Sequence, residues 1–158
     1  MRNLNISVRS LIIPLKHDKL LLPNASLAEI ITYTSPDPID GSPEWCAGIL
    51  TWRGQGIPLL SFEALQGGVM AKSGDKSRVA VFNALGGKKE LPFFAFVVEG
   101  IPHLVNANQS VVTALAEHTG VDVGVSAHVM VEAEPMIIPD LDQIESMIMA
   151  EKTISARL

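Results

Sequence analysis

Residues 45–60 read Trp-Cys-Ala-Gly-Ile-Leu-Thr-Trp-Arg-Gly-Gln-Gly-Ile-Pro-Leu-Leu. Two runs that suit strands, Ile49–Arg53 and Ile57–Leu60, flank the short segment Gly54-Gln55-Gly56. Glycines between two such runs are typical of a tight turn that joins antiparallel strands. This stretch therefore predicts a β-hairpin near the middle of the chain.

The same arrangement of apolar runs and turn residues recurs on both sides of this hairpin. His17-Asp18 joins two apolar runs near the amino terminus. Gly86–Lys89 separates Val79–Phe82 from Phe93–Val98, which is apolar enough to be covered on both faces. Short strands that alternate with glycine turns are typical of small barrels or sandwiches, so we expect a mostly β protein.

A period of two dominates the second half of the chain. Between Val121 and Glu132, apolar side chains alternate with polar ones, which predicts a strand with one buried face and one wetter face. The polar stretch Gly67–Ser77 lies near the middle of the chain, and we interpret it as the crossover between two sheet subdomains.

Signals for helices are few. Ser26 and Glu29 have the spacing of a capping box, which predicts the start of a helix. Asp140 and Gln143 have the same spacing near the carboxyl terminus. An apolar stripe with helical spacing follows Asp140, so we expect a terminal helix that covers the open end of a sheet. This stripe consists of Leu141, Ile144 and Ile148.

Composition excludes several classes of protein. The 158 residues are 47% hydrophobic and 18% charged, the reverse of the balance in a disordered chain. The net charge is −5 and the basic residues are scattered, so nucleic acid is not an expected partner. No apolar run approaches the length of a membrane span or a secretory signal, so we expect a soluble cytoplasmic protein.

No motif for catalysis, cofactor binding or metal binding is found in the sequence. The single cysteine, Cys46, lies in an apolar context typical of inert packing. The four histidines lack the spacing of metal ligands, and neither a nucleophile elbow nor a complete phosphate-binding loop occurs. We therefore predict no catalytic, cofactor or metal residues. A small β-barrel enzyme remains an alternative, which would require a deep pocket that holds His103 or His118 beside a carboxylate.

The stretch from Leu27 to Leu60 also carries a family resemblance. An apolar-x-Glu-Ile element is followed by a proline-containing loop and then by the hairpin of residues 45–60. This order resembles the signature of the CheW-like family of bacterial chemosensory adaptors, in which the hairpin reads Gly-Val-x-Asn-Leu-Arg-Gly-x-x-x-Pro-Val-x-Asp-Leu. The residues that match are Glu29, Gly48, Arg53, Gly54 and Pro58. The residues that depart from the pattern are Thr51, Trp52 and Ser61, where the family usually has Asn, Leu and Asp.

The resemblance implies a fold of two packed SH3-like five-stranded barrels with a short carboxyl-terminal helix. It implies one domain over residues 1–158. We expect one subdomain to comprise Asn5–Phe62 with the carboxyl-terminal segment and the other to comprise Arg78–Met130. It also implies a non-catalytic adaptor that links the cytoplasmic tip of a methyl-accepting chemoreceptor to a CheA-type histidine kinase. Association with a membrane would then be indirect, through receptors.

The resemblance further implies a protein-binding groove. Its positions would be Leu27, Ile30, Gly48 and Ile49, with Gly54 in the adjoining turn. Glu29 and Arg53 are expected to form an ion pair that orients this groove, and the alternatives are an inconsequential surface pair or an arginine that only packs. Alternation along the strand predicts Trp52 in the core, on the face opposite to Arg53, and leaves Trp45 as a candidate for the groove rim.

Two further functions remain open at this point. The departures at Thr51 and Ser61 suggest a divergent member, for example an adaptor in a system that controls type IV pili and twitching. The same fold could instead be a protein-binding module outside chemosensing, and the sequence does not separate these alternatives.

Overall fold

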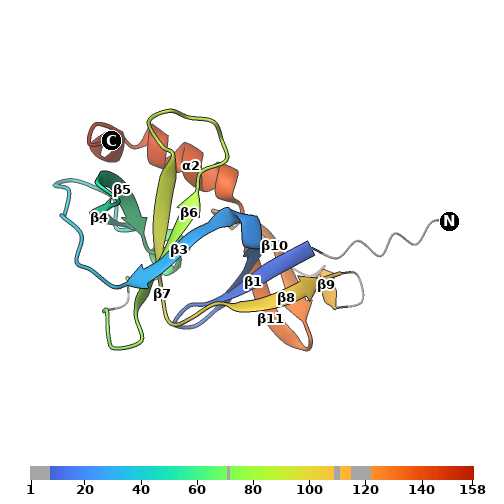
Figure 1. Cartoon of the computed structure of the whole chain (residues 1–158). Helices are drawn as coiled ribbons and strands as arrows, with labels where there is room; N and C mark the ends of the chain where they lie inside the picture. The colour runs from blue at the N-terminus through green and yellow to red at the C-terminus, as the bar shows by residue number, and fades with distance from the viewer. Residues whose placement is uncertain (1–7, 71, 109–110, 115–121) are drawn as a thin grey trace.

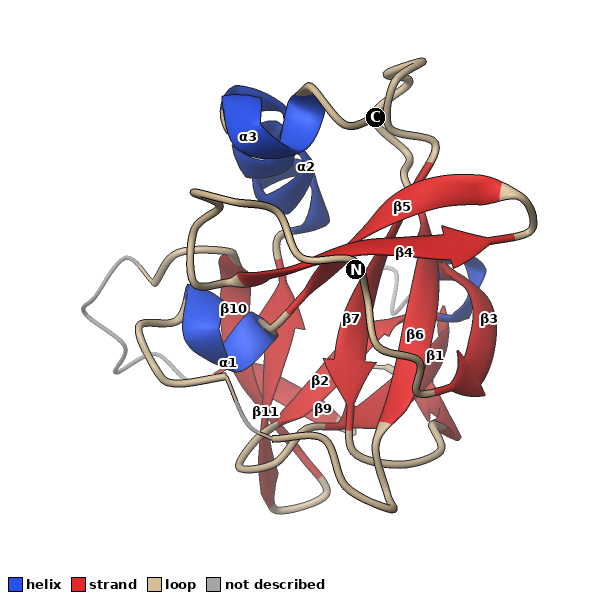
Figure 2. Ribbon diagram, turned by 90° about the vertical axis from the view of Figure 1, so that its left-hand side faces the viewer, coloured by secondary structure: helices blue, strands red, loops and turns tan. Residues whose placement is uncertain are grey.

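The computed structural model describes residues 8–70, 72–108, 111–114 and 122–158, which form two curled sheets and a helical carboxyl terminus (Figures 1 and 2). The mostly β fold with a short terminal helix is thereby confirmed. Sheet A has six strands in the order β8-β1-β2-β11-β10-β9, and sheet B has five in the order β3-β6-β7-β5-β4.

Sheet A combines strands from both ends of the described chain. Its strands are β1 (Val8–Pro14), β2 (Lys19–Pro23), β8 (His103–Ala107), β9 (Val112–Ala114), β10 (Val125–Val131) and β11 (Glu134–Pro139). The hairpin expected at His17-Asp18 joins β1 to β2. The sheet has one strand more than the expected five, because the three-residue β9 pairs with β10 at its edge.

Sheet B is built from the middle of the chain. Its strands are β3 (Leu27–Thr32), β4 (Cys46–Trp52), β5 (Gln55–Leu60), β6 (Arg78–Asn83) and β7 (Phe93–Val98). The predicted hairpins at residues 45–60 and 79–98 are β4–β5 and β6–β7. The parallel pair β5–β7 joins these two hairpins into one sheet.

The strands divide between the sheets differently from the expected subdomain bounds. The chain enters sheet B at Leu27 and returns to sheet A at His103, so the segment 67–77 joins the short helix α1 (Phe62–Leu65) to β6 within one sheet. Short connections suffice for both crossings. The first is the single helical turn η1 (Asn24–Ser26), and the second lies beside β1, where Glu99 N donates to Pro14 O over 2.8 Å. Asn5 lies outside the described residues.

One of the two predicted helix starts is wrong. Ser26 ends η1, and the residues after it form strand β3 because they pair with β6 along its length. The other is confirmed, since Oδ1 of Asp140 accepts from Gln143 N at the start of α2 (Leu141–Ala150). A last short helix, α3 (Lys152–Ser155), follows.

The strand expected from Val121 begins later than predicted. Strand β10 starts at Val125, and Val121 lies outside the described residues. Gly124 precedes the strand with a φ of +73° and hydrogen-bonds to the first turn of α2, so this point of the chain is a turn.

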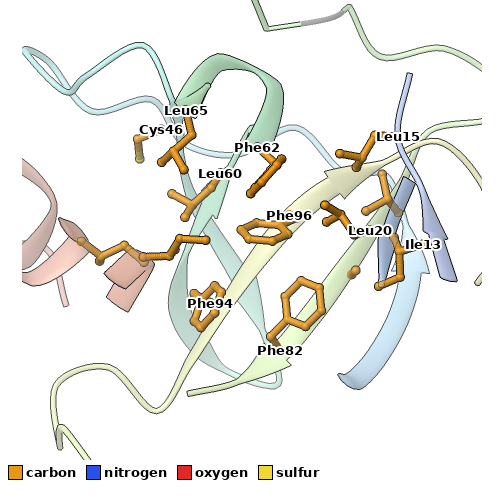
Figure 3. Packing of buried hydrophobic residues seen from close by; sticks show 14 of the residues in the cluster. Ile13, Leu15, Leu20, Cys46, Leu60, Phe62, Leu65, Phe82, Phe94 and Phe96 are labelled. Carbon is orange, nitrogen blue, oxygen red and sulfur yellow. The ribbon is translucent and has the colours of Figure 1, made fainter. Parts of the chain in front are cut away.

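The main core lies between the two sheets and against α2 (Figure 3). Its centre is aromatic, with the rings of Phe82 and Phe96 edge-on at 4.9 Å. Ile13 and Leu20 reach it from sheet A, and Ile148 reaches it from α2. One continuous core therefore joins the sheets.

Each sheet also curls around a smaller cluster of its own. In sheet B this cluster comprises Leu50, Trp52, Ile57, Leu59, Val79, Val81 and Ala95. In sheet A it comprises Leu21, Val129, Val131 and Met136. Side chains therefore fill the concave side of each curled sheet as well as the space between the sheets.

Candidate protein-binding site

The turn of the β4–β5 hairpin presents Arg53. Trp52 and Gln55 form the last cross-strand pair, and Arg53 and Gly54 between them have φ values of +48° and +76°. Positive φ at both positions defines the two-residue type I′ turn, whose twist suits a hairpin. The turn therefore includes Arg53 and ends before Gln55, slightly earlier than the sequence predicts.

Glu29 reaches this turn from the opposite edge of sheet B. A β-bulge between Leu27 and Glu29 shifts the register of β3 against β6. Glu29 shares a strand face with Ile31, which is two residues further on. Its Oε2 accepts from Nη2 of Arg53 at 3.2 Å and from Nε1 of Trp52 at 2.9 Å. The expected ion pair is present, and it connects the turn after the edge strand β4 to the other edge strand, β3.

Trp52 is buried, as predicted, but Arg53 does not point away from it. The guanidinium carbon of Arg53 lies 4.4 Å from the centroid of the indole ring. Strand alternation does not apply to Arg53, because it occupies a turn with positive φ. We call Glu29, Trp52 and Arg53 together the clasp.

The ion pair alone would contribute little to stability. The side chains of Arg53 and Glu29 are 65% and 39% exposed, and exposed pairs contribute about 0–1 kcal/mol. Trp52 is only 5% exposed and packs edge-on against Phe93 at 4.8 Å. The buried indole therefore gives the exposed pair a fixed anchor.

Gly48 is a structural requirement of the loop that precedes β4. Its φ is +142°, and a Cβ atom there would lie 2.2 Å from the carbonyl oxygen of Asp37. Asp37 and Ile49 exchange two backbone hydrogen bonds of 2.8 Å, so the proline-rich loop covers the free edge of β4. Only glycine permits this close approach.

The structure brings only some of the predicted groove residues to the surface. Leu27 and Ile30 are half-buried on β3 and pack on the main core. Ile49 is 8% exposed and belongs to that core, and Gly48 lies under the loop. Trp45 is half-buried against the same core. Of the predicted residues, those of the clasp and the half-buried side chains of β3 are therefore the ones that remain accessible.

Two roles in this region were not foreseen from the sequence. The bond from Trp52 to Glu29 could have been suspected, because a buried indole N–H needs an acceptor. Ser61, where the family pattern has Asp, accepts from Ala64 N over 3.2 Å and caps α1. Asp and Ser are both good caps, so this departure preserves the local structure.

Other chemistry would need grouped ligands or reactive side chains among the described residues. Among them, no three His, Cys, Asp or Glu side chains are grouped so that they could hold a metal ion. Burial raises the pKa of the Cys46 thiol, its hydrogen bond to Gly48 O opposes this rise, and the Glu151 carboxylate adds to it. His103 is exposed on the edge strand β8, and His118 lies outside the described part of the chain. No helix in this part is long and apolar enough to cross a bilayer.

Comparison with known proteins identifies the family. The pattern that defines the CheW-like domain matches residues 9–148, which include both sheets and most of α2. The chain belongs to the CheW-like domain family. CheW-like proteins are non-catalytic scaffolds or adaptors of chemotaxis, which agrees with the predicted class of function.

A solved structure agrees with this assignment at the level of fold. The chain is similar to the crystal structure of the scaffolding protein TtCheW from Thermoanaerobacter tengcongensis, with 18% identity and a TM-score of 0.69. The similarity covers 85% of this chain and 89% of that chain. A search of curated protein sequences found no match.

Proposed function

We propose that this CheW-like protein couples the cytoplasmic tip of a methyl-accepting chemoreceptor to a CheA-type histidine kinase. The observation that carries the proposal is the clasp, in which Glu29 and Arg53 pair at the sites where the family signature has them. The protein would work in the cytoplasm and reach the membrane only through receptors.

The edge strand β3 is the element that we assign to the receptor. Leu27 and Ile30 are apolar and stay partly exposed, and Glu29 of the charged clasp lies between them in the strand. A receptor tip is a helical hairpin, and a helix docks by placing an apolar stripe against such side chains. The kinase would bind at a different lateral surface of the protein. Its regulatory domain has the same fold, and two domains of like fold can pack against each other pseudo-symmetrically.

The test is capture of a receptor tip and of the kinase regulatory domain by the purified full-length chain. Arg53→Glu puts two carboxylates side by side at the clasp, and we expect it to abolish retention of the receptor tip. Lys19→Glu is the matched control, because Lys19 also forms an exposed ion pair, with Glu134 at 2.8 Å in sheet A. Unchanged retention by Arg53→Glu would remove Arg53 from the site, and no retention by wild type would refute the proposed function.

The same capture separates the two pathways. Thr51 is exposed on β4 beside the clasp, where the family usually has Asn. Retention of a receptor and kinase that control type IV pili, in place of a flagellar pair, would assign the protein to twitching.

A further inference from the structure

The indole of Trp52 contacts both members of the Glu29–Arg53 pair. Its Nε1–H donates to Oε2 of Glu29 over 2.9 Å, and its ring centroid lies 4.4 Å from the guanidinium carbon of Arg53. The same carboxylate oxygen accepts from Nη2 of Arg53. The clasp is therefore a closed triangle of contacts, and only its tryptophan is buried.

Trp52 has the most restricted surroundings of the three groups. Its ring packs edge-on against Phe93, and its backbone is paired with Gln55 in the β4–β5 ladder. Arg53 and Glu29 are long side chains with large exposed fractions, so holding them in one geometry costs conformational entropy. Contact with a buried and closely packed ring lowers that cost, because Arg53 and Glu29 then have fewer orientations to lose when a partner binds.

Most of the hydrogen-bonding capacity of Arg53 is left unused. Among the residues that the structure describes, its guanidinium donates only through Nη2 and only to Glu29. A guanidinium carries five N–H donors in a planar fork that matches a carboxylate. Because the Arg53 side chain is mostly exposed, the remaining donors can meet an acidic group on a partner.

We propose that Trp52 is a positioning residue. It fixes the plane in which Arg53 presents its free donors to a carboxylate of the docking partner. It acts through two contacts at once, the hydrogen bond to Glu29 and the ring against the guanidinium. The identity of the partner rests on the proposed function, whereas the orienting role rests on the contacts alone. The partly buried bond to Glu29 also predicts that the orientation persists at high salt, which screens an isolated exposed pair.

The first test reads the orientation without any partner. In the full chain at pH 6, ¹⁵N relaxation of the Arg53 Nε–H group reports its order. We expect an ordered group in wild type at 50 mM and at 500 mM NaCl. We expect clear loss of order in Trp52→Phe, which keeps a ring, and greater loss in Trp52→Leu. Equal order in all three proteins would overturn the proposal, provided that their backbone spectra show the native fold.

The second readout follows the indole bond itself. The chain has two tryptophans, so Trp45→Phe assigns the two indole N–H signals. We expect the Trp52 signal to exchange slowly with water in wild type and in Glu29→Gln, whose amide oxygen still accepts. Exchange should be at least tenfold faster in Glu29→Leu. The same slow exchange in Glu29→Leu would show that Glu29 does not hold the indole, contrary to the proposal.

The third test measures coupling in binding to a receptor tip fragment. We expect Trp52→Phe and Arg53→Gln each to weaken binding about three- to tenfold, and the double variant to be no worse than Arg53→Gln alone. Lys19→Gln is the matched control and should bind normally. Additive losses would show that Trp52 acts independently of Arg53 and would overturn its positioning role. Absence of binding by wild type would refute the proposed function, and the two spectroscopic tests would still decide whether Trp52 orients Arg53.

Discussion

At the scale of single residues, Gly48 and Gly54 both match the family signature, but they are required for different structural reasons. Gly48 lies under the loop at Asp37, and a Cβ atom there would collide with backbone. We expect Gly48→Ala to lower the free energy of unfolding by about 3 kcal/mol or more, because the loop must move off β4. Urea unfolding followed by tryptophan fluorescence measures the loss.

Gly54→Ala is the control for this prediction. Gly54 also has a positive φ, of +76°, but nothing lies within 4 Å of a Cβ atom placed there. Only the backbone conformation is then unfavourable, so we expect a loss of about 1 kcal/mol. If the two substitutions cost the same, the close approach of Asp37 does not limit the choice of residue at Gly48.

Cys46 gives a residue-scale prediction about pH. Burial raises the pKa of its thiol in the folded protein above the ordinary value of about 8.5. The neutral thiol therefore contributes stability that is complete below pH 8 and is lost as the pH rises through the folded pKa. We expect unfolding free energy to fall more steeply between pH 8 and pH 10 in wild type than in Cys46→Ala. Parallel curves for the two proteins would contradict this assignment.

At the scale of elements, Ser61 caps helix α1 at a position where the family pattern has Asp, another good capping residue. Its side chain accepts from Ala64 N at the start of α1. Phe62 and Leu65 of this helix pack in the main core. Ser61→Ala leaves that donor unsatisfied, and we expect a loss of about 1 kcal/mol in thermal unfolding. Ser61→Asp keeps an acceptor and should unfold as wild type does. Equal losses in both variants would show that the cap does not stabilise α1.

The two capping-box patterns show how far local sequence determines an element. Asp140 starts a helix because the residues after it carry an apolar stripe with helical spacing, which the core accepts. Ser26 has the same local signal, but the residues after it pair with β6, and sheet pairing prevails over the cap. The hairpins were predictable because their turns are encoded locally. The division of strands between sheets was not, because it depends on pairings distant in sequence.

The candidate site was predictable to a similar extent. The Glu29–Arg53 pair followed from the family signature and is present. The burial of Ile49 depends on how the loop at Asp37 folds over β4, which a pattern of residue types does not encode. The bond from Trp52 to Glu29 joins the two edge strands of sheet B, and which strands form the edges depends on pairings distant in sequence.

At the scale of the whole molecule, helix α2 connects the two sheets. Oε1 of its Gln143 accepts from Gly124 N, next to β10 of sheet A. Oε1 of Glu145, a side chain only 1% exposed, accepts from Gly86 N in the loop between β6 and β7 of sheet B. The apolar side of the same helix enters the core that the sheets share. Packing therefore opposes independent movement of the sheets.

This shared core predicts that the two sheets unfold together. Ile148 is fully buried in it, and Ile148→Ala should lower the free energy of unfolding by about 2–5 kcal/mol. Because Ile148 belongs to the core that both sheets share, amide hydrogen exchange should show the same loss in β2 of sheet A and in β7 of sheet B. Thr153→Ala, a partly buried change in α3, is the control and should shift neither strand by more than about 0.5 kcal/mol. A loss of stability confined to one sheet would mean that the sheets are separate cooperative units. The core would then not transmit an effect of binding at the clasp in sheet B to sheet A.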